Sequence, residues 1–134
     1  FGIDDPDPQL LQVLRVDLEG DGVDEVLVVA ERFQGGGLAG AQAGDYSIVY
    51  LRKVIGNEVQ QLVLHHSTLQ NLAPDEFGYL EAFRVPTVAD LDGDGQMEIV
   101  TQGFYYEGSW TEMWEYVDNG QGEAVVALSV GCGV

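Results

Sequence analysis

The feature that most constrains the fold is an acidic, glycine-containing segment that occurs twice in the chain. Residues 16–28 read VDLEGDGVDEVLV and residues 89–101 read ADLDGDGQMEIVT, so Asp17 and Asp90 are equivalent positions. Both segments carry acids at alternate positions, then Asp-Gly, then a further acid and a β-prone run. A segment that recurs with matching flanks indicates two similar structural units rather than a chance acidic turn.

The flanks of both acidic segments are typical of short strands, because they are rich in Val, Ile, Tyr and Trp and are bounded by Gly, Asn and Asp. We expect four strands in each unit, at Leu10–Val16, Glu25–Val29, Asp45–Lys53 and Glu58–His65, and at Tyr79–Val88, Glu98–Phe104, Trp110–Val117 and Glu123–Val130. Ile55-Gly56-Asn57 and Asp118–Gly122 are the expected hairpin turns, and one helical turn is expected within Ser67–Phe77.

These signals predict an all-β fold in a single domain over residues 1–134, with internal repeats at about 10–66 and 79–131. Each repeat forms a four-stranded antiparallel, blade-like unit with its acidic loop between the first two strands. The two units form a partial propeller or a small sandwich, and the sequence leaves this choice open. The Gly-rich stretch 34–44 is expected to be a mobile surface loop.

The acidic loops have the composition of calcium sites. A calcium ion takes six to eight oxygen ligands, and a short loop supplies them when alternate side chains point inward and one backbone carbonyl joins them. Glycine permits the sharp turn that such a loop needs. The predicted ligands are Asp17, Glu19, Asp21, the Val23 carbonyl and Glu25 in the first loop, and Asp90, Asp92, Asp94, the Gln96 carbonyl and Glu98 in the second. We therefore expect two bound Ca²⁺ ions.

An EF-hand is a poor match to these loops, because it requires a bidentate Glu at position 12 and flanking helices. Position 12 is Val28 in the first loop and Thr101 in the second, and β-branched residues follow. The pattern D-x-D-G-D-G-x-x-E before a strand instead resembles the FG-GAP or VCBS repeats, the calcium-loop blades of integrin-α-like β-propellers. The resemblance is carried by Asp90, Asp92, Asp94, Gly95 and Glu98, and by Asp17, Asp21, Gly22 and Glu25.

The resemblance implies structural calcium, a role in binding partners, and a location outside the cell, at its surface or in the periplasm. Two features depart from the family pattern: the chain has no Gly-Ala-Pro, and it offers two blades where full propellers of this kind have about seven and closure needs at least about four. The expected function is thus an extracellular calcium-binding module with an adhesion-type role toward a protein or a glycan.

The charge of the chain narrows the class of partners. Lys and Arg total 5 and Asp and Glu total 23, a formal net charge of −18, which disfavours nucleic acid and anionic membrane surfaces. The sequence has no apolar run of about 18 residues, so we expect no direct membrane insertion. Two alternatives stay open: a hydrolase or lyase acting on polysaccharide with calcium as scaffold, and a structural subunit that forms homo-oligomers.

Two further groups of residues are candidates for function. Trp110, Trp114 and Tyr116 share one face of a predicted strand, which predicts either a blade core or an exposed platform for a partner. His65 and His66 are adjacent on a predicted strand and therefore face opposite sides, so they cannot easily ligate one ion. We expect a binding module rather than an enzyme, because no catalytic motif is present beside the loops.

Overall fold

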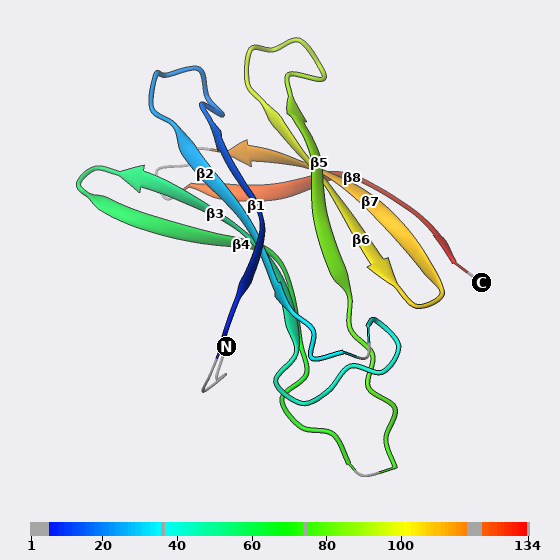
Figure 1. Ribbon diagram of the computed structural model, residues 1–134. Coiled ribbons are helices and arrows are strands. Elements are labelled where there is room, and N and C mark those ends of the chain that lie inside the picture. The colour runs from blue at the N-terminus through cyan, green and yellow to red at the C-terminus, as the bar shows by residue number, and fades with distance from the viewer. Residues whose placement is uncertain (1–5, 36, 74, 118–121, 134) are drawn as a thin grey trace.

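The computed structural model describes residues 6–35, 37–73, 75–117 and 122–133, and these form eight strands in two antiparallel sheets. The first sheet holds β1 (Gln9–Val16), β2 (Glu25–Arg32), β3 (Tyr46–Ile55) and β4 (Glu58–Thr68); the second holds β5 (Ala82–Ala89), β6 (Glu98–Tyr105), β7 (Gly108–Val117) and β8 (Glu123–Gly133). Each sheet is a simple meander in chain order (Figure 1). The predicted all-β fold of two four-stranded, blade-like units is confirmed.

The two sheets share one hydrophobic core. Alternate residues of β2, β3, β5 and β6 point into it, as a strand with one buried face requires. The core cluster is Leu18, Leu27, Val29, Val49, Leu51, Leu64, Phe83, Val85, Ile99 and Tyr116. A smaller cluster of Ala30, Tyr46 and Ile48 covers the opposite face of the first sheet, which explains why β2 is buried on both sides.

The connection between β2 and β3, residues 33–45, forms hydrogen bonds with the connection between the two sheets, residues 69–81. The buried carboxylate of Asp45 accepts hydrogen bonds from the backbone amides of Gln34 (3.0 Å) and Gln42 (2.8 Å). The amides of Gly40 and Ala41 donate to the carbonyl of Gly78. A Cβ atom at Gly78 would lie 2.2 Å from the Ala41 carbonyl oxygen, so this close approach requires glycine.

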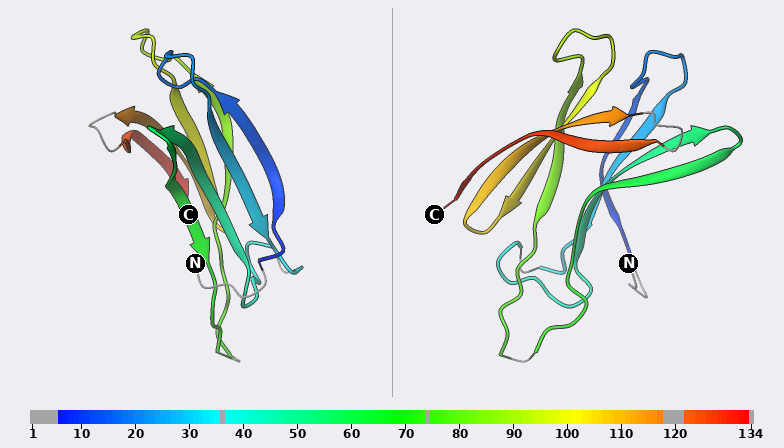
Figure 2. Two further views of the ribbon diagram at one scale, coloured as in Figure 1. Left: turned by 90° about the vertical axis from the view of Figure 1, so that its left-hand side faces the viewer. Right: turned by 180° about the vertical axis from the view of Figure 1, so that it is seen from behind.

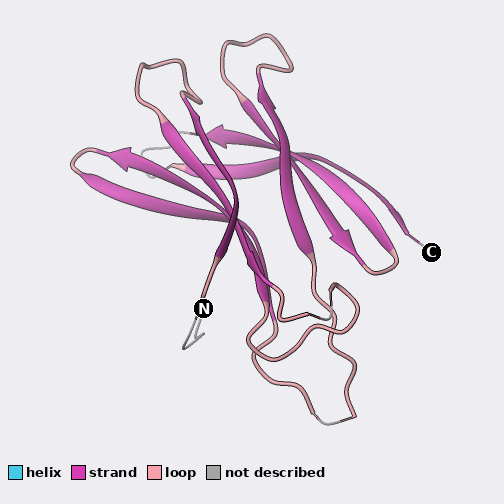
Figure 3. Cartoon of the chain, viewed as in Figure 1, coloured by secondary structure: helices cyan, strands magenta, loops and turns pink. Residues whose placement is uncertain are grey.

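The expected helical turn within Ser67–Phe77 is wrong for the residues that the structure describes there. The hydrogen-bonded ladder with β3 carries β4 on to Thr68, and residues 69–73 and 75–77 contain no helix (Figure 3). Turn residues 118–121 of the predicted β7–β8 hairpin lie outside the described residues. Within the described part of the chain, no helix has the length and apolar character needed to cross a membrane.

Candidate metal centre

The two acidic loops, residues 17–24 and 90–97, are held by similar internal hydrogen bonds. The first aspartate of each loop accepts two backbone amides: Asp17 from Asp21 (3.0 Å) and Gly22 (2.8 Å), and Asp90 from Gly93 (2.6 Å) and Gly95 (3.1 Å). Gly22 and Gly95 have φ angles of +86° and +94°, a conformation that side chains with a Cβ rarely adopt. The shared Asp-Gly pattern therefore produces the same turn twice.

A buried glutamate closes each loop at the start of the following strand. The Glu25 carboxylate accepts the Leu18 amide at 2.9 Å, and the Glu98 carboxylate accepts the Leu91 amide at 2.6 Å. Glu25 is 0% exposed and Glu98 is 3% exposed. Both carboxylates thus face the interior of their loop, where a charge requires a partner.

The two loops lie side by side at the same end of the molecule (Figures 1 and 2). The backbone amide of Met97 in the second loop donates to the carbonyl of Leu18 in the first at 2.8 Å. A Cβ atom at Gly20 would be 3.5 Å from the carbonyl oxygen of Gly95, which shows how closely the two backbones approach.

The second acidic loop brings three predicted ligands together. Carboxylate oxygens of Asp90, Asp92 and Glu98 lie within 4.8 Å of one another, and this is the one such group of His, Cys, Asp or Glu side chains among the residues with described positions. Asp92 and Glu98 border a hollow of about 350 Å³ whose lining also includes Asp94, Gln96 and Glu115. The Asp94 carboxylate instead accepts the Gln96 backbone amide at 2.8 Å and its side-chain amide at 3.3 Å. Ligation by the Gln96 carbonyl stays a prediction.

The first acidic loop already contains a cation. The ammonium of Lys53, from β3, forms ion pairs with Glu19 and, at 3.5 Å, with Glu25. The Lys53 side chain is 9% exposed, and its Nζ atom lies 4.2 Å from the centre of the Tyr116 ring. Asp17 and Asp21 are held in the turn by backbone amides, and the Val23 amide donates to Asp21 at 2.8 Å. Lys53 therefore supplies a positive charge to two of the predicted ligands of the first loop, Glu19 and Glu25.

At the position equivalent to Lys53, the second loop has an acid. The β2–β3 register pairs Val26 with Arg52, so the next residues along, Glu25 and Lys53, stand opposite one another. The β6–β7 register pairs Ile99 with Trp114, and the next residues there are Glu98 and Glu115. The carboxylates of the first loop thus face an ammonium, whereas those of the second loop face another carboxylate.

Burial raises the pKa of the Glu25 carboxyl above its ordinary value, and the negative charges of Asp21 and Asp17 act in the same direction, while the Leu18 amide opposes them. The ionised form of Glu25 therefore costs folding free energy at neutral pH, and this cost is relieved as the pH falls toward the ordinary carboxyl value. The Lys53 ammonium, 3.5 Å from the Glu25 carboxylate, is the cation that faces it.

The three aromatic residues proposed for partner binding line the interface between the sheets. Tyr116 is 8% exposed and belongs to the core cluster, and the half-buried Trp110 and Trp114 pack against that cluster. Gly103, across the strand from Trp110, leaves room for the indole, since a Cβ there would lie 2.3 Å from the ring. We therefore assign these side chains to the core and do not propose them as a platform.

His65 and His66 lie on opposite faces of β4, as their adjacency predicts. His65 points between the sheets, where its ring stacks on Phe83 with centroids 4.8 Å apart. Its Nε2 atom lies 2.8 Å from the Thr101 hydroxyl and 3.4 Å from the Glu112 carboxylate, and Trp114 donates to the same hydroxyl at 2.9 Å. His66 lines a groove on the outer face of the first sheet.

The buried position of His65 predicts a loss of stability in mild acid. Burial lowers the pKa of the imidazole below its ordinary value, and the charge of Glu112 offsets this only in part. The neutral ring is thus favoured in the folded state, and its contribution is complete above about pH 6.5 and declines as the pH falls. The free energy of unfolding should fall by up to about 1.4 kcal/mol per pH unit for this one proton.

Urea unfolding at pH values between 7.5 and 5.5 gives the slope of the unfolding free energy against pH. The slope of the full wild-type chain minus that of a His65→Gln variant is the contribution of His65. Glu25 and Glu81, whose pKa values burial raises, push in the opposite direction but are present in both proteins. His66→Gln, on the opposite face of β4, is the matched control for the loss of one imidazole. Equal slopes for wild type and His65→Gln would contradict the assignment.

Comparison with known proteins adds no assignment, because no protein-family model, no curated protein and no solved structure matches this chain.

Proposed function

We propose that this chain is a calcium-stabilised β module whose ion is held by the second acidic loop and joins β5 to β6. The observation that carries the proposal is the cluster of Asp90, Asp92 and Glu98 oxygens within 4.8 Å, with Glu115 at the position where the first loop has Lys53. Several carboxylates held close together without a cation repel one another, so binding an ion adds directly to the stability of the fold.

The chemistry of the donors favours calcium. All the candidate side-chain ligands are oxygens, and the cluster holds neither imidazole nor thiolate, which softer transition metals prefer. Calcium binds oxygen at about 2.3–2.6 Å, so two ligands on opposite sides of one ion stand about 4.6–5.2 Å apart. The spread of the three carboxylates fits this span.

We propose one ion in place of the two that the sequence led us to expect. In the first acidic loop, Lys53 supplies the positive charge that Glu19 and Glu25 require. A calcium ion in that loop would have to displace a nearly buried ammonium that also packs on the Tyr116 ring.

We further propose an extracellular, adhesion-type role toward a protein or glycan partner, in line with the resemblance to FG-GAP and VCBS repeats. Extracellular modules work with calcium dissociation constants of about 0.1–1 mM. The second acidic loop is exposed, and all of its predicted ligands lie between the end of β5 and the first residue of β6, so we expect its dissociation constant to lie in that range. The chain's net charge of −18 also favours cation binding from solution.

Calorimetric titration of the full chain with calcium tests the site. We expect one ion per chain with a dissociation constant of about 0.1–1 mM. Asp92→Asn should abolish binding, because the amide removes a charge while its oxygen can still accept the Asp94 backbone amide that Asp92 accepts at 3.0 Å. Asp75→Asn, an exposed acid in the connection between the sheets, is the control and should bind as wild type does.

A wild-type chain that takes up no calcium at about ten times the upper dissociation constant would overturn the proposal. So would an Asp92→Asn variant that binds calcium as tightly as the wild-type chain.

A further inference from the structure

We propose that a second copy of this chain docks head-to-tail, with the outer face of its first sheet (β1–β4) against the outer face of the second sheet (β5–β8). The chain already contains one contact of this kind. Leu27 and Val29 point from the first sheet into the shared core, and their counterparts in the second repeat are Val100 and Gln102. The second sheet turns the other face inward, through Ile99. The two sheets therefore meet through non-equivalent faces, which is a heterologous rather than a two-fold contact.

A comparison of Leu18 with Leu91 indicates which surface of this chain the second copy would cover. Leu18, the second residue of the first loop, is 1% exposed because the second sheet closes over it, and the Met97 amide caps its carbonyl. Its counterpart Leu91 is 53% exposed. A further sheet placed on the second as the second is placed on the first would bury Leu91 in the same way.

The outer face of the second sheet carries a row of apolar side chains. Val100 pairs with Met113, and Met113 pairs with Leu128. Leu128 is 56% exposed, and Val130 on the same face is 57% exposed. The residue equivalent to Met113 in the first sheet is Leu51, the partner of Leu27, which is fully buried in the core. This face thus matches the one that the first sheet buries.

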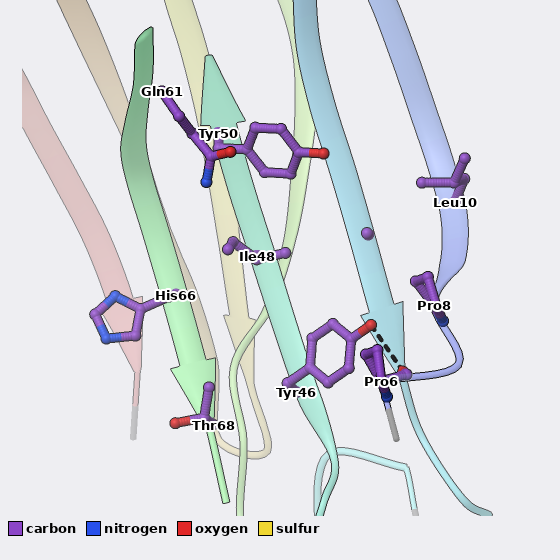
Figure 4. A pocket seen from close by; sticks show the side chains of 10 residues that line it. Pro6, Pro8, Leu10, Tyr46, Ile48, Tyr50, Gln61, His66 and Thr68 are labelled. Atoms are coloured by element: carbon purple, nitrogen blue, oxygen red, sulfur yellow. Dashed lines mark hydrogen bonds between the residues drawn. The ribbon is translucent and has the colours of Figure 1, made fainter. Parts of the chain in front are cut away.

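The outer face of the first sheet is the complementary surface. It bears a groove of about 360 Å³ whose lining includes the buried Ala30, Tyr46 and Ile48 and the more exposed Leu10, Tyr50 and His66 (Figure 4). Leu10 is 60% exposed, and its counterpart in the second repeat is the core residue Phe83. By register, Ile48 opposite Ala30 corresponds to Trp110 opposite Gly103, which packs against the core. The groove face is therefore the counterpart of the face that the second sheet buries.

Charge favours the same pairing of faces. Arg15 and Arg52 stand on either side of Val26 on the outer face of the first sheet, and they are two of only five basic residues. The outer face of the second sheet carries Glu115 beside Met113. Two copies with a net charge of −18 each repel one another over longer distances, so salt should strengthen the association.

Sedimentation of the full chain in calcium and about 0.5 M NaCl, where the Debye length is about 4 Å, tests the contact. The mass should rise above 14.6 kDa as the concentration increases from about 5 to 200 µM. Leu10→Glu blocks the outer face of the first sheet, and Leu128→Glu blocks that of the second. Each variant alone should stay at 14.6 kDa, and an equimolar mixture should form a heterodimer of twice that mass through the two intact faces.

Both variants change side chains that are more than half exposed, so we expect them to fold, which circular dichroism checks. Phe77→Glu, at a 61% exposed position in the connection between the sheets, is the control and should associate as wild type does. A wild-type chain that stays monomeric throughout overturns the proposal. A single variant that still dimerises alone also overturns it, because that result indicates a two-fold contact through one face.

Discussion

Replacing Lys53 by alanine lowers the free energy of unfolding in chelator by about 3–5 kcal/mol, the loss expected when one partner of a buried ion pair is removed. Glu25 is 0% exposed, and its carboxylate would then stand among acids with no nearby ammonium. The variant also loses the contact between the Lys53 Nζ atom and the Tyr116 ring. Urea unfolding at low protein concentration measures the difference.

Calcium should restore much of that loss in Lys53→Ala, because the first loop then keeps acids at the four sequence positions equivalent to Asp90, Asp92, Asp94 and Glu98 without a competing ammonium. The number of ions bound per chain should rise from one to two in a calorimetric titration. Arg52→Ala, an exposed neighbour on the opposite face of β3, is the control and should change neither stability nor ion count. A Lys53→Ala chain that loses stability and still binds a single ion would show that the first loop is not a latent calcium site.

Glu115→Lys should remove the dependence of the melting temperature on calcium. The new ammonium would stand opposite Glu98 as Lys53 stands opposite Glu25. In the wild-type chain, calcium at about 100 times its dissociation constant should add about 2.7 kcal/mol, or about 10 °C in melting temperature for a domain of this size. In the variant this increment should be lost, and the protein in chelator should melt at or slightly above the wild-type temperature.

Glu107→Lys provides the matched control, because it changes the net charge equally at an exposed site in the β6–β7 turn. It should keep the wild-type response to calcium. If the melting temperature of Glu115→Lys rises with calcium as that of the wild-type chain does, the charge at position 115 does not control calcium binding by the second loop.

The strands, their order and the acidic turns could be predicted from sequence because their signals are local. Alternating apolar residues define the strands, and the turn at Gly56 sets the β3–β4 hairpin. The Asp-Gly pairs at Gly22 and Gly95 place positive φ angles where the loops bend. β4 and β8 extend past their expected ends, to Thr68 and Gly133. They do so because their neighbours β3 and β7 offer backbone partners along that whole length.

The role of Lys53 could not be predicted, because it depends on the register between β2 and β3. The long connection 33–45 separates these strands, and a loop of that length does not set a register. The exchange of Lys53 for Glu115 is visible in the sequence only after the structure aligns the two hairpins. Leu18 is buried and Leu91 is exposed because the second sheet covers the first loop and no sheet among the described residues covers the second. This difference depends on the tertiary arrangement, so it could not be predicted from two loops of nearly identical sequence.

The hydrogen bond from the Met97 amide to the Leu18 carbonyl joins the two loops, so we expect them to open together in local unfolding. A fluctuation that moves the second loop away from the sheets must break the Met97–Leu18 hydrogen bond. It then frees the backbone of Leu18, whose side chain is buried in the core. We therefore expect the second loop to open together with the first, and the lysine-paired first loop to restrain the motion of its neighbour.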